Sequence, residues 1–256
     1  MNKTHLRAPI VLVHGLLGFD RLRVLGWPIA TYFNGIPEVL TAAGNCVVIP
    51  VLSPTGSVAA RAAELKAFLD ATVPDEPVHL IAHSMGGLDS RYMISRLGMH
   101  DRVLTLTTLG TPHRGTAFAD WGTDHLGASV QAFLDLFCIS ADAFYDLRRD
   151  RCAEFNRQTP DAEKVRYYSI AGVFVPDPLS SLWRLSYDVI TEQEGVNDGL
   201  VSVASARYGE RFEQWDDTNH ADLINWPNPA AQIEGHWHNR ASDYLVLITR
   251  LASEGF

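Results

Sequence analysis

The chain has 256 residues, of which 46% are hydrophobic, and its formal net charge at neutral pH is −9. This length and composition suffice for a single domain with a large core. The acidic balance, with an isoelectric point near 5.5, argues against nucleic acid or an anionic membrane surface as the main partner. No apolar run approaches the roughly 20 residues that cross a bilayer, so no transmembrane segment is predicted.

Strand-like and helix-like segments alternate along the chain. The strands predicted from short apolar runs are Ile10–Val13, Cys46–Pro50, Val78–Ala82, Leu104–Leu109, Val165–Ala171 and Arg211–Gln214. The predicted helices are Ile36–Ala43, Ala59–Leu69, Met85–Leu97, a segment within Leu126–Ile139, Ala141–Asn156 and a last one near Asn239–Ser253. This alternation predicts an α/β fold, with a mostly parallel sheet of about six strands and helices on both faces, in one domain over residues 1–256.

The first predicted strand runs directly into a glycine-bearing loop, His14–Gly18. Such a loop can turn backbone N–H groups toward a reacting carbonyl. The loop is therefore a candidate for stabilising negative charge on a substrate oxygen.

Ser84 lies between the strand Val78–Ala82 and a helix that starts near Gly86. A nucleophilic serine at such a turn needs very small residues two positions before and after it, so that strand and helix can approach, and Ala82 and Gly86 meet this need. By itself the pattern also fits an ordinary strand-to-helix turn with a serine N-cap.

An acid and a base follow in chain order. Asp198 lies in a turn before Gly199, and His220 lies in a later loop. The order Ser, Asp, His is that of α/β-hydrolases. Three other acids compete for the role, namely Asp216, Asp217 and Asp222, and the pair His236 and His238 could supply another base or share a metal. His14, His83 and His113 are expected to form hydrogen bonds within their loops rather than to take part in the chemistry.

Six collinear stretches together resemble one family. They are PIVLVHGLLGFD (9–20), YFNGI (32–36), AHSMGGLDSRY (82–92), LGTPHRGTAFAD (109–120), NDGLVS (197–202) and NHADLIN (219–225). The chain resembles the bacterial true lipases of the Pseudomonas, Burkholderia and Proteus type, the family I triacylglycerol lipases of the α/β-hydrolase superfamily. It departs from them in being shorter and in carrying Ala204 where many members have half of a disulfide.

The resemblance implies a minimal α/β-hydrolase fold and a serine carboxylester hydrolase. Ser84 would be the nucleophile, His220 its base and Asp198 the acid that orients His220, with the backbone N–H groups of Leu16 and Met85 as the oxyanion hole. The implied substrate is an acylglycerol, cleaved through an acyl-enzyme. A short-chain esterase or polyester hydrolase on the same triad is the alternative, and a non-catalytic binding protein of this fold is the alternative outside enzymes.

The resemblance also implies a structural calcium ion near His220 and no organic cofactor. Its ligands would be the carboxylates of Asp177 and Asp222 and the carbonyls of Trp226 and Ala230, with a cis peptide before Pro227. Oxygen ligands of this kind suit Ca²⁺. Two solvated aspartates are the alternative interpretation.

The resemblance further implies that residues 122–156 form a lid. Their apolar residues recur at the spacing of one helix face: Leu126, Val130, Phe133, Leu134 and Phe137. A lid that exposes this face when open could bind a lipid–water interface. A helix packed permanently on the core fits the same spacing.

The sequence says less about compartment. Residues 1–7 show no signal peptide, whereas the resemblance implies secretion, so both a secreted and a cytoplasmic location stay open. The three cysteines, Cys46, Cys138 and Cys152, have no metal-ligand spacing and predict no disulfide framework. Cys46, in an apolar run, is predicted to be buried.

Overall fold

The computed structural model describes residues 4–16, 21–24, 27–54, 56–125, 141–176, 183–226 and 238–256. Its main sheet has the strand order β4-β1-β5-β6-β7-β8, and every pair of neighbours is parallel. The strands are β1 (Ile10–Val13), β4 (Val47–Val48), β5 (Val78–His83), β6 (Val103–Leu109), β7 (Arg166–Gly172) and β8 (Arg211–Trp215). The predicted six-stranded α/β fold is confirmed.

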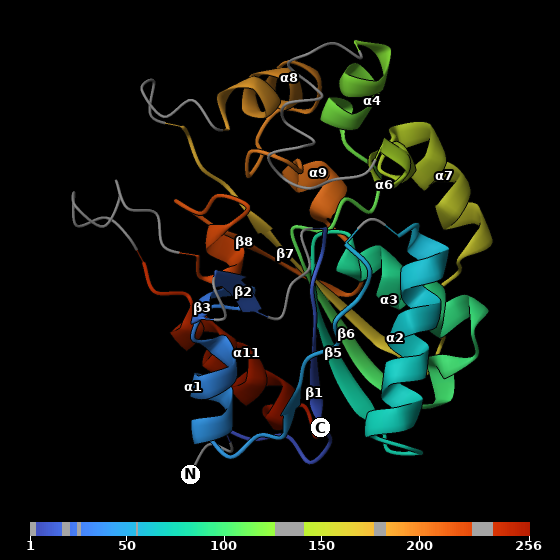
Figure 1. Cartoon of the computed structure of the whole chain (residues 1–256), viewed down its shortest axis with the longest axis vertical. Coiled ribbons are helices and arrows are strands. Elements are labelled where there is room, and N and C mark those ends of the chain that lie inside the picture. Colours follow the sequence, from blue (N-terminus) through green and yellow to red (C-terminus); the bar gives the residue numbers. More distant parts are fainter. Residues whose placement is uncertain are drawn as a thin grey trace.

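Alternate residues of β1 face opposite layers. Ile10 and Leu12 belong to the core cluster that includes α1 (Ile36–Ala42) and α11 (Ala241–Ser253), whereas Val11 and Val13 belong to the cluster with α2 (Val58–Thr72) and α3 (Gly86–Arg96). This period of two explains why a central strand is apolar throughout. Figure 1 shows the two helix pairs on opposite sides of the sheet. None of the helices in the described ranges is long and apolar enough to cross a membrane.

A third group of helices lies over one end of the sheet (Figure 1). It comprises α4 (Ala117–Asp124), α6 (Ala141–Asp146), α7 (Arg149–Gln158), α8 (Arg184–Glu194) and α9 (Val203–Ala206). The sequence predicts α6 and α7 as one helix, but Arg148 adopts an extended conformation, with φ −64° and ψ 149°, and separates them. Helices α4, α8 and α9 are not predicted from the sequence. Residues 126–140, with the apolar face of the predicted lid, lie outside the described residues.

The edge of the sheet differs most from the sequence prediction. The predicted strand Cys46–Pro50 is reduced to the two residues of β4, and the Cys46 side chain, predicted to be buried, is exposed. Cys46 precedes the strand, and its carbonyl accepts the first edge hydrogen bond, from Ile10 N–H at 2.8 Å. An antiparallel hairpin of β2 (Arg21–Val24) and β3 (Trp27–Thr31), not predicted from the sequence, follows β1.

Candidate active site

Ser84 occupies a strained turn at the carboxyl end of β5. Its φ is +55°, a region that residues with a side chain seldom adopt. The turn is held by Ser84 N–H, which donates to the Leu109 carbonyl at 2.9 Å, and by Thr111 Oγ1, which donates to the Ser84 carbonyl at 2.7 Å. A Cβ on Gly86 would lie 2.7 Å from the carbonyl oxygen of His14, so the turn needs glycine there. The geometry matches the strand-to-helix turn that the sequence predicts.

The Asp198 carboxylate contacts the ring of His220. Asp198 Oδ2 lies 2.8 Å from His220 Nδ1, and Asp198 Oδ1 accepts hydrogen bonds from the N–H groups of Leu200 at 3.0 Å and Val201 at 2.8 Å. The His220 N–H donates to the Asp198 carbonyl at 2.8 Å, so backbone and side chain hold the pair together. A carboxylate on Nδ1 keeps the hydrogen there and leaves the Nε2 lone pair available to a proton.

The rival acids take other positions. Asp216 and Asp217 are exposed, and Asp222 accepts a hydrogen bond from Asn219 N–H at 2.9 Å. Burial raises the pKa of Asp222 to about 6. Of the four candidate acids, all within the described ranges, Asp198 is the one with a hydrogen bond to the His220 ring.

Two glycines bring the segments of the site together at the carboxyl ends of β1 and β6, the strands on either side of β5. A Cβ on Gly110, which follows β6, would lie 3.0 Å from Asp198 Oδ2 and 3.1 Å from His220 Cε1. A Cβ on Gly15, in the loop after β1, would lie 2.7 Å from Ser84 Cβ. The predicted oxyanion residues flank this convergence, with Leu16 next to Gly15 and Met85 next to Ser84, and both side chains are buried.

A buried arginine that the sequence analysis did not single out holds the loop after β1. Arg61 Nη2 donates to the His14 carbonyl at 2.7 Å and to the Gly15 carbonyl at 3.1 Å, and its Nε donates to Asp89 Oδ2 at 2.8 Å. In a trans peptide the C=O and N–H groups point in opposite directions. The Gly15 carbonyl points at Arg61, so the N–H of Leu16 points away from it.

The Arg61–Asp89 pair is fully buried, and both side chains have no exposed surface. Burial raises the pKa of Asp89 to about 7, while the Arg61 guanidinium opposes this rise. A sequence signal existed: Arg61 lies on the same face of α2 as the buried Val58, Ala62, Leu65 and Leu69. A charged residue on an otherwise apolar helix face is a signal for a buried, paired group.

His14 and His113 form hydrogen bonds within their loops, as the sequence predicts. His14 Nδ1 donates to the Gly15 carbonyl at 2.9 Å, and His14 Nε2 accepts from Leu52 N–H at 2.9 Å. Burial lowers the pKa of His14 to about 4, so the ring is neutral. His113 lies 3.0 Å from Thr108 Oγ1 and stacks on Tyr208 with 4.1 Å between ring centroids.

The stretches GTPHRGT and NDGLVS, far apart in the chain, contact each other. Thr116 Oγ1 donates to the Leu200 carbonyl at 2.9 Å. Just beyond NDGLVS, Ser205 Oγ donates to the Gly115 carbonyl at 2.6 Å. Glu194, at the end of α8, accepts from Ala117 N–H at 2.5 Å. These contacts fix the base of the loop that carries Asp198.

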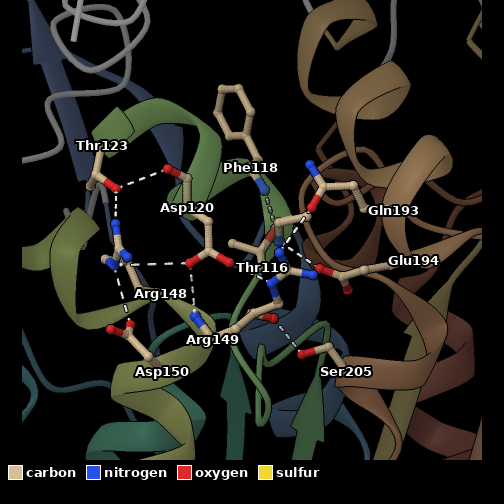
Figure 2. Close-up of polar contacts among 12 residues, drawn as sticks. Thr116, Phe118, Asp120, Thr123, Arg148, Arg149, Asp150, Gln193, Glu194 and Ser205 are labelled. Carbon is tan, nitrogen blue, oxygen red and sulfur yellow. Dashed lines mark hydrogen bonds and ion pairs between the residues drawn. The ribbon is translucent and has the colours of Figure 1, made fainter. Parts of the chain in front are cut away.

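Ion pairs extend this bracing outward to the helices above the sheet (Figure 2). Asp120 on α4 pairs with Arg149 at the start of α7, and Arg149 Nη2 donates to Gln193 on α8 at 2.9 Å. Arg148 lies between Asp120 and Asp150. Helices α4, α7 and α8 are therefore joined to one another as well as to the Asp198 loop.

The predicted calcium ligands are placed in part. Asp222 lies in a short 3-10 turn (Asp222–Ile224) directly after His220, and Trp226 follows it, but Asp177, Ala230 and Pro227 lie outside the described residues. Within the described ranges, no group of three or more His, Cys, Asp or Glu side chains could hold a metal ion. Of the rival metal pair, His238 Nε2 lies 3.0 Å from Asp243 Oδ2, and His236 lies outside the described residues.

Comparisons with known proteins identify relatives of this chain. Residues 63–205 match the family model described as "PGAP1-like alpha/beta domain". Triacylglycerol lipase 2 of Saccharomyces cerevisiae is 35% identical over 80% of this chain, and the match spans 65% of the length of that relative. The triacylglycerol lipase of Vibrio cholerae is 31% identical over 87% of this chain and 81% of its own length. The structure of the mature Bacillus licheniformis lipase BlEst2 superposes with a TM-score of 0.73 at 25% identity, covering 89% of this chain and 91% of that one.

The chain belongs to the lipases of the α/β-hydrolase type. It is a carboxylester hydrolase, so the sequence-based alternative of a non-catalytic binding protein is set aside. The match to the PGAP1-like family model, over residues 63–205, includes both the turn that bears Ser84 and the loop that bears Asp198.

Proposed function

We propose that this lipase-type hydrolase cleaves acylglycerol esters with a Ser84–Asp198–His220 triad. The observation that carries the proposal is the 2.8 Å contact between Asp198 Oδ2 and His220 Nδ1. It lies at the carboxyl end of the sheet, where Ser84 occupies its strained turn. A serine hydroxyl is a weak nucleophile by itself and needs an adjacent base that is held in the right tautomer.

The proposed reaction has two halves. Ser84 Oγ attacks the ester carbonyl carbon while its proton passes to His220 Nε2, and the tetrahedral intermediate collapses when His220 returns that proton to the leaving alcohol. Water then attacks the acyl-enzyme with His220 again as base, which releases the fatty acid and restores Ser84. Asp198 stabilises the transient imidazolium and keeps its own charge.

Backbone N–H groups of Leu16 and Met85 would hold the oxyanion. Arg61 supports this role of Leu16, because it draws the Gly15 carbonyl to the opposite side of the same peptide. Loss of one such donor costs on the order of 3 kcal/mol in transition-state stabilisation.

The first test is hydrolysis of p-nitrophenyl esters of increasing chain length and of triglyceride emulsions, by the wild type and Ser84→Ala. Activity that peaks on long chains and emulsions and is lost in Ser84→Ala supports the lipase. A short-chain optimum lost in the same variant selects the esterase or polyester hydrolase instead. Equal activity of the two proteins contradicts Ser84 as the nucleophile.

The assignment to the Pseudomonas, Burkholderia and Proteus type also stays a proposal. The triacylglycerol lipases of Pseudomonas fragi and Burkholderia plantarii are each 28% identical to this chain, over 88% and 86% of its length. These identities support a relation to that type and lie below that of the yeast relative.

Calcium near His220 is part of the proposal. Asp222 fits it, since burial raises the pKa of this carboxyl to about 6 and a cation would favour its charged form. The Asp222 and Asp177 carboxylates and the carbonyls of Trp226 and Ala230 would hold the ion, which would brace the His220 loop without touching substrate.

Thermal unfolding tests the calcium site without measuring catalysis. We expect Ca²⁺ at 100 times its Kd to stabilise the fold by about 3 kcal/mol, with EDTA reversing the shift. Asp222→Asn should abolish the response, whereas the exposed Asp217→Asn should keep it. An unchanged Tm of the EDTA-treated wild type on adding Ca²⁺ would contradict the site.

A further inference from the structure

His83 and Tyr32 connect two loops of the site through an unbroken series of hydrogen bonds. His83 Nε2 lies 3.0 Å from the His220 carbonyl oxygen, and His83 Nδ1 lies 2.7 Å from Tyr32 Oη. Tyr32 Oη in turn accepts from Gly15 N–H at 2.9 Å. Both side chains are buried, His83 with 2% and Tyr32 with 4% of its surface exposed.

The direction of each bond follows from the groups involved. A carbonyl can only accept, so His83 Nε2 carries a hydrogen and donates it to His220. Burial lowers the pKa of His83 well below its ordinary value, so the ring is neutral and its Nδ1 is an acceptor for the Tyr32 hydroxyl. The Tyr32 oxygen then receives Gly15 N–H on a lone pair, and every group in the series has a matched partner.

The series connects the loop that carries the Leu16 N–H with the backbone of His220, two groups that must keep a fixed distance from each other. The peptide His14–Gly15 is held on both sides, its carbonyl by Arg61 and its N–H by Tyr32. The next peptide carries the N–H of Leu16. At the other end His83 holds the backbone of His220, and the two imidazole rings lie 4.5 Å apart.

We propose that Tyr32 and His83 are positioning residues that set the distance between the oxyanion donor at Leu16 and the base His220. This inference rests on the proposed function of those two groups. Neither Tyr32 nor His83 needs to touch substrate. Their effect is expected in the transition state, because a displacement of about 1 Å in a catalytic group can cost about a hundredfold in rate.

Tyr32→Phe removes the acceptor of Gly15 N–H and the donor to His83 while keeping the ring. We expect kcat to fall about 10- to 100-fold with KM nearly unchanged. Affinity for an alkylboronic acid, which forms a tetrahedral adduct with a nucleophilic serine, should fall by a similar factor. Affinity for the uncleavable ether analogue of the substrate should stay the same, because it does not reach the transition state.

Tyr167→Phe is the matched control. Tyr167 is also 4% exposed, and its hydroxyl oxygen accepts a backbone N–H, that of Ala162, at 3.1 Å. The substitution deletes the same kind of bond at the same burial away from the site. We expect a somewhat smaller loss of stability, because one hydrogen bond is removed rather than two, and kcat and boronic acid affinity equal to those of the wild type. A fall in kcat of Tyr167→Phe equal to that of Tyr32→Phe would show a general effect of destabilisation and overturn the proposal.

His83→Gln provides a second, independent variant. A glutamine amide can still donate to the His220 carbonyl but no longer offers Tyr32 an acceptor in the place of Nδ1. Both substitutions break the same series of bonds. The kcat of the double variant should therefore be only slightly lower than that of the less active single variant. Additive losses would overturn the proposal.

The same measurements separate this inference from the triad. Activity retained by Ser84→Ala contradicts both proposals. An inactive Ser84→Ala together with wild-type kcat and boronic acid affinity in Tyr32→Phe leaves the triad standing and overturns the positioning role alone.

Discussion

Arg61 and Arg91 are buried on the same side of the sheet, on α2 and α3, and their surroundings differ. Arg61 has no exposed surface, pairs with Asp89 and donates to carbonyls of the loop after β1. Arg91 is 3% exposed and has no carboxylate in direct contact within the described residues. It lies over the ring of Tyr208 at 4.1 Å and that of Phe155 at 5.1 Å.

Two hydrogen-bond acceptors of Arg91 lie on α7 and directly after it. Its Nη1 donates to Asn156 Oδ1 at 2.8 Å and its Nη2 to the Thr159 carbonyl at 3.3 Å. Rings and neutral acceptors can stabilise a desolvated guanidinium. Arg61 is thus tied to the geometry of the site, whereas Arg91 ties α7 to α3. Removing them should have different consequences.

Arg61→Met should have the largest effect. It leaves Asp89 buried without its partner, and we expect the free energy of unfolding to fall by about 3–5 kcal/mol. It also frees the carbonyls of His14 and Gly15, so kcat should fall as well. Urea unfolding and ester hydrolysis below the unfolding transition measure the two effects.

Arg61→Met/Asp89→Asn separates stability from activity. The second substitution removes the unpaired charge, so part of the lost stability should return while kcat stays low. If kcat recovered together with stability, Arg61 would have no role in orienting the loop and the contrast with Arg91 would disappear.

Arg91→Met should have a smaller effect, on stability alone. It removes hydrogen bonds and two ring contacts but leaves no unpaired charge, so we expect a loss of about 1–3 kcal/mol in the free energy of unfolding. The kcat for a soluble ester, measured well below the Tm, should equal that of the wild type. A lower kcat in the fully folded variant would mean that the α3–α7 contact also supports catalysis.

The smallest expected effect is on pH dependence, at His113 beside Arg91. Burial holds the pKa of His113 well below its ordinary value of 6.5, so the native ring stays neutral where the unfolded chain binds a proton. The stability that comes from burying a neutral His113 is therefore fully present above about pH 6.5 and is lost as pH falls toward the pKa of the folded state. His113→Asn should reduce the decline in stability between pH 7 and 5.5 by about 1 kcal/mol.

His100→Asn is the control for this measurement, because His100 is on the surface. A change in slope equal to that of His113→Asn would show that losing any histidine, buried or exposed, has this effect. A slope in His113→Asn identical to that of the wild type would place its native pKa near that of the unfolded chain.

The sequence predicted those parts of the protein that depend on local patterns. The alternation of strands and helices gave the six-stranded sheet, and small residues around Ser84 indicated its turn. It did not predict α4, α8 and α9, whose positions depend on contacts such as Thr116 with Leu200 and Arg149 with Gln193. These partners are 84 and 44 residues apart, so no local pattern records them.

The supporting residues of the site were missed for a related reason. Tyr32 belongs to the stretch YFNGI, and Arg61 lies on an apolar helix face. Their importance, however, comes from the backbone groups that they bind. A backbone carbonyl or N–H has no identity in the sequence. The residue pattern left several acids open and the family resemblance selected Asp198. The contact of Asp198 with the His220 ring is what the structure adds.

The two outer strands of the sheet affect how the protein behaves at high concentration. An open sheet presents unpaired backbone groups at both borders, which invite pairing with another chain. Here β4 spans two residues, and β8 carries Arg211 and Glu213, which form ion pairs with Glu254 and Arg250 at the C-terminal end of the chain. A short border on one side and a charged border on the other discourage the addition of a strand from another molecule.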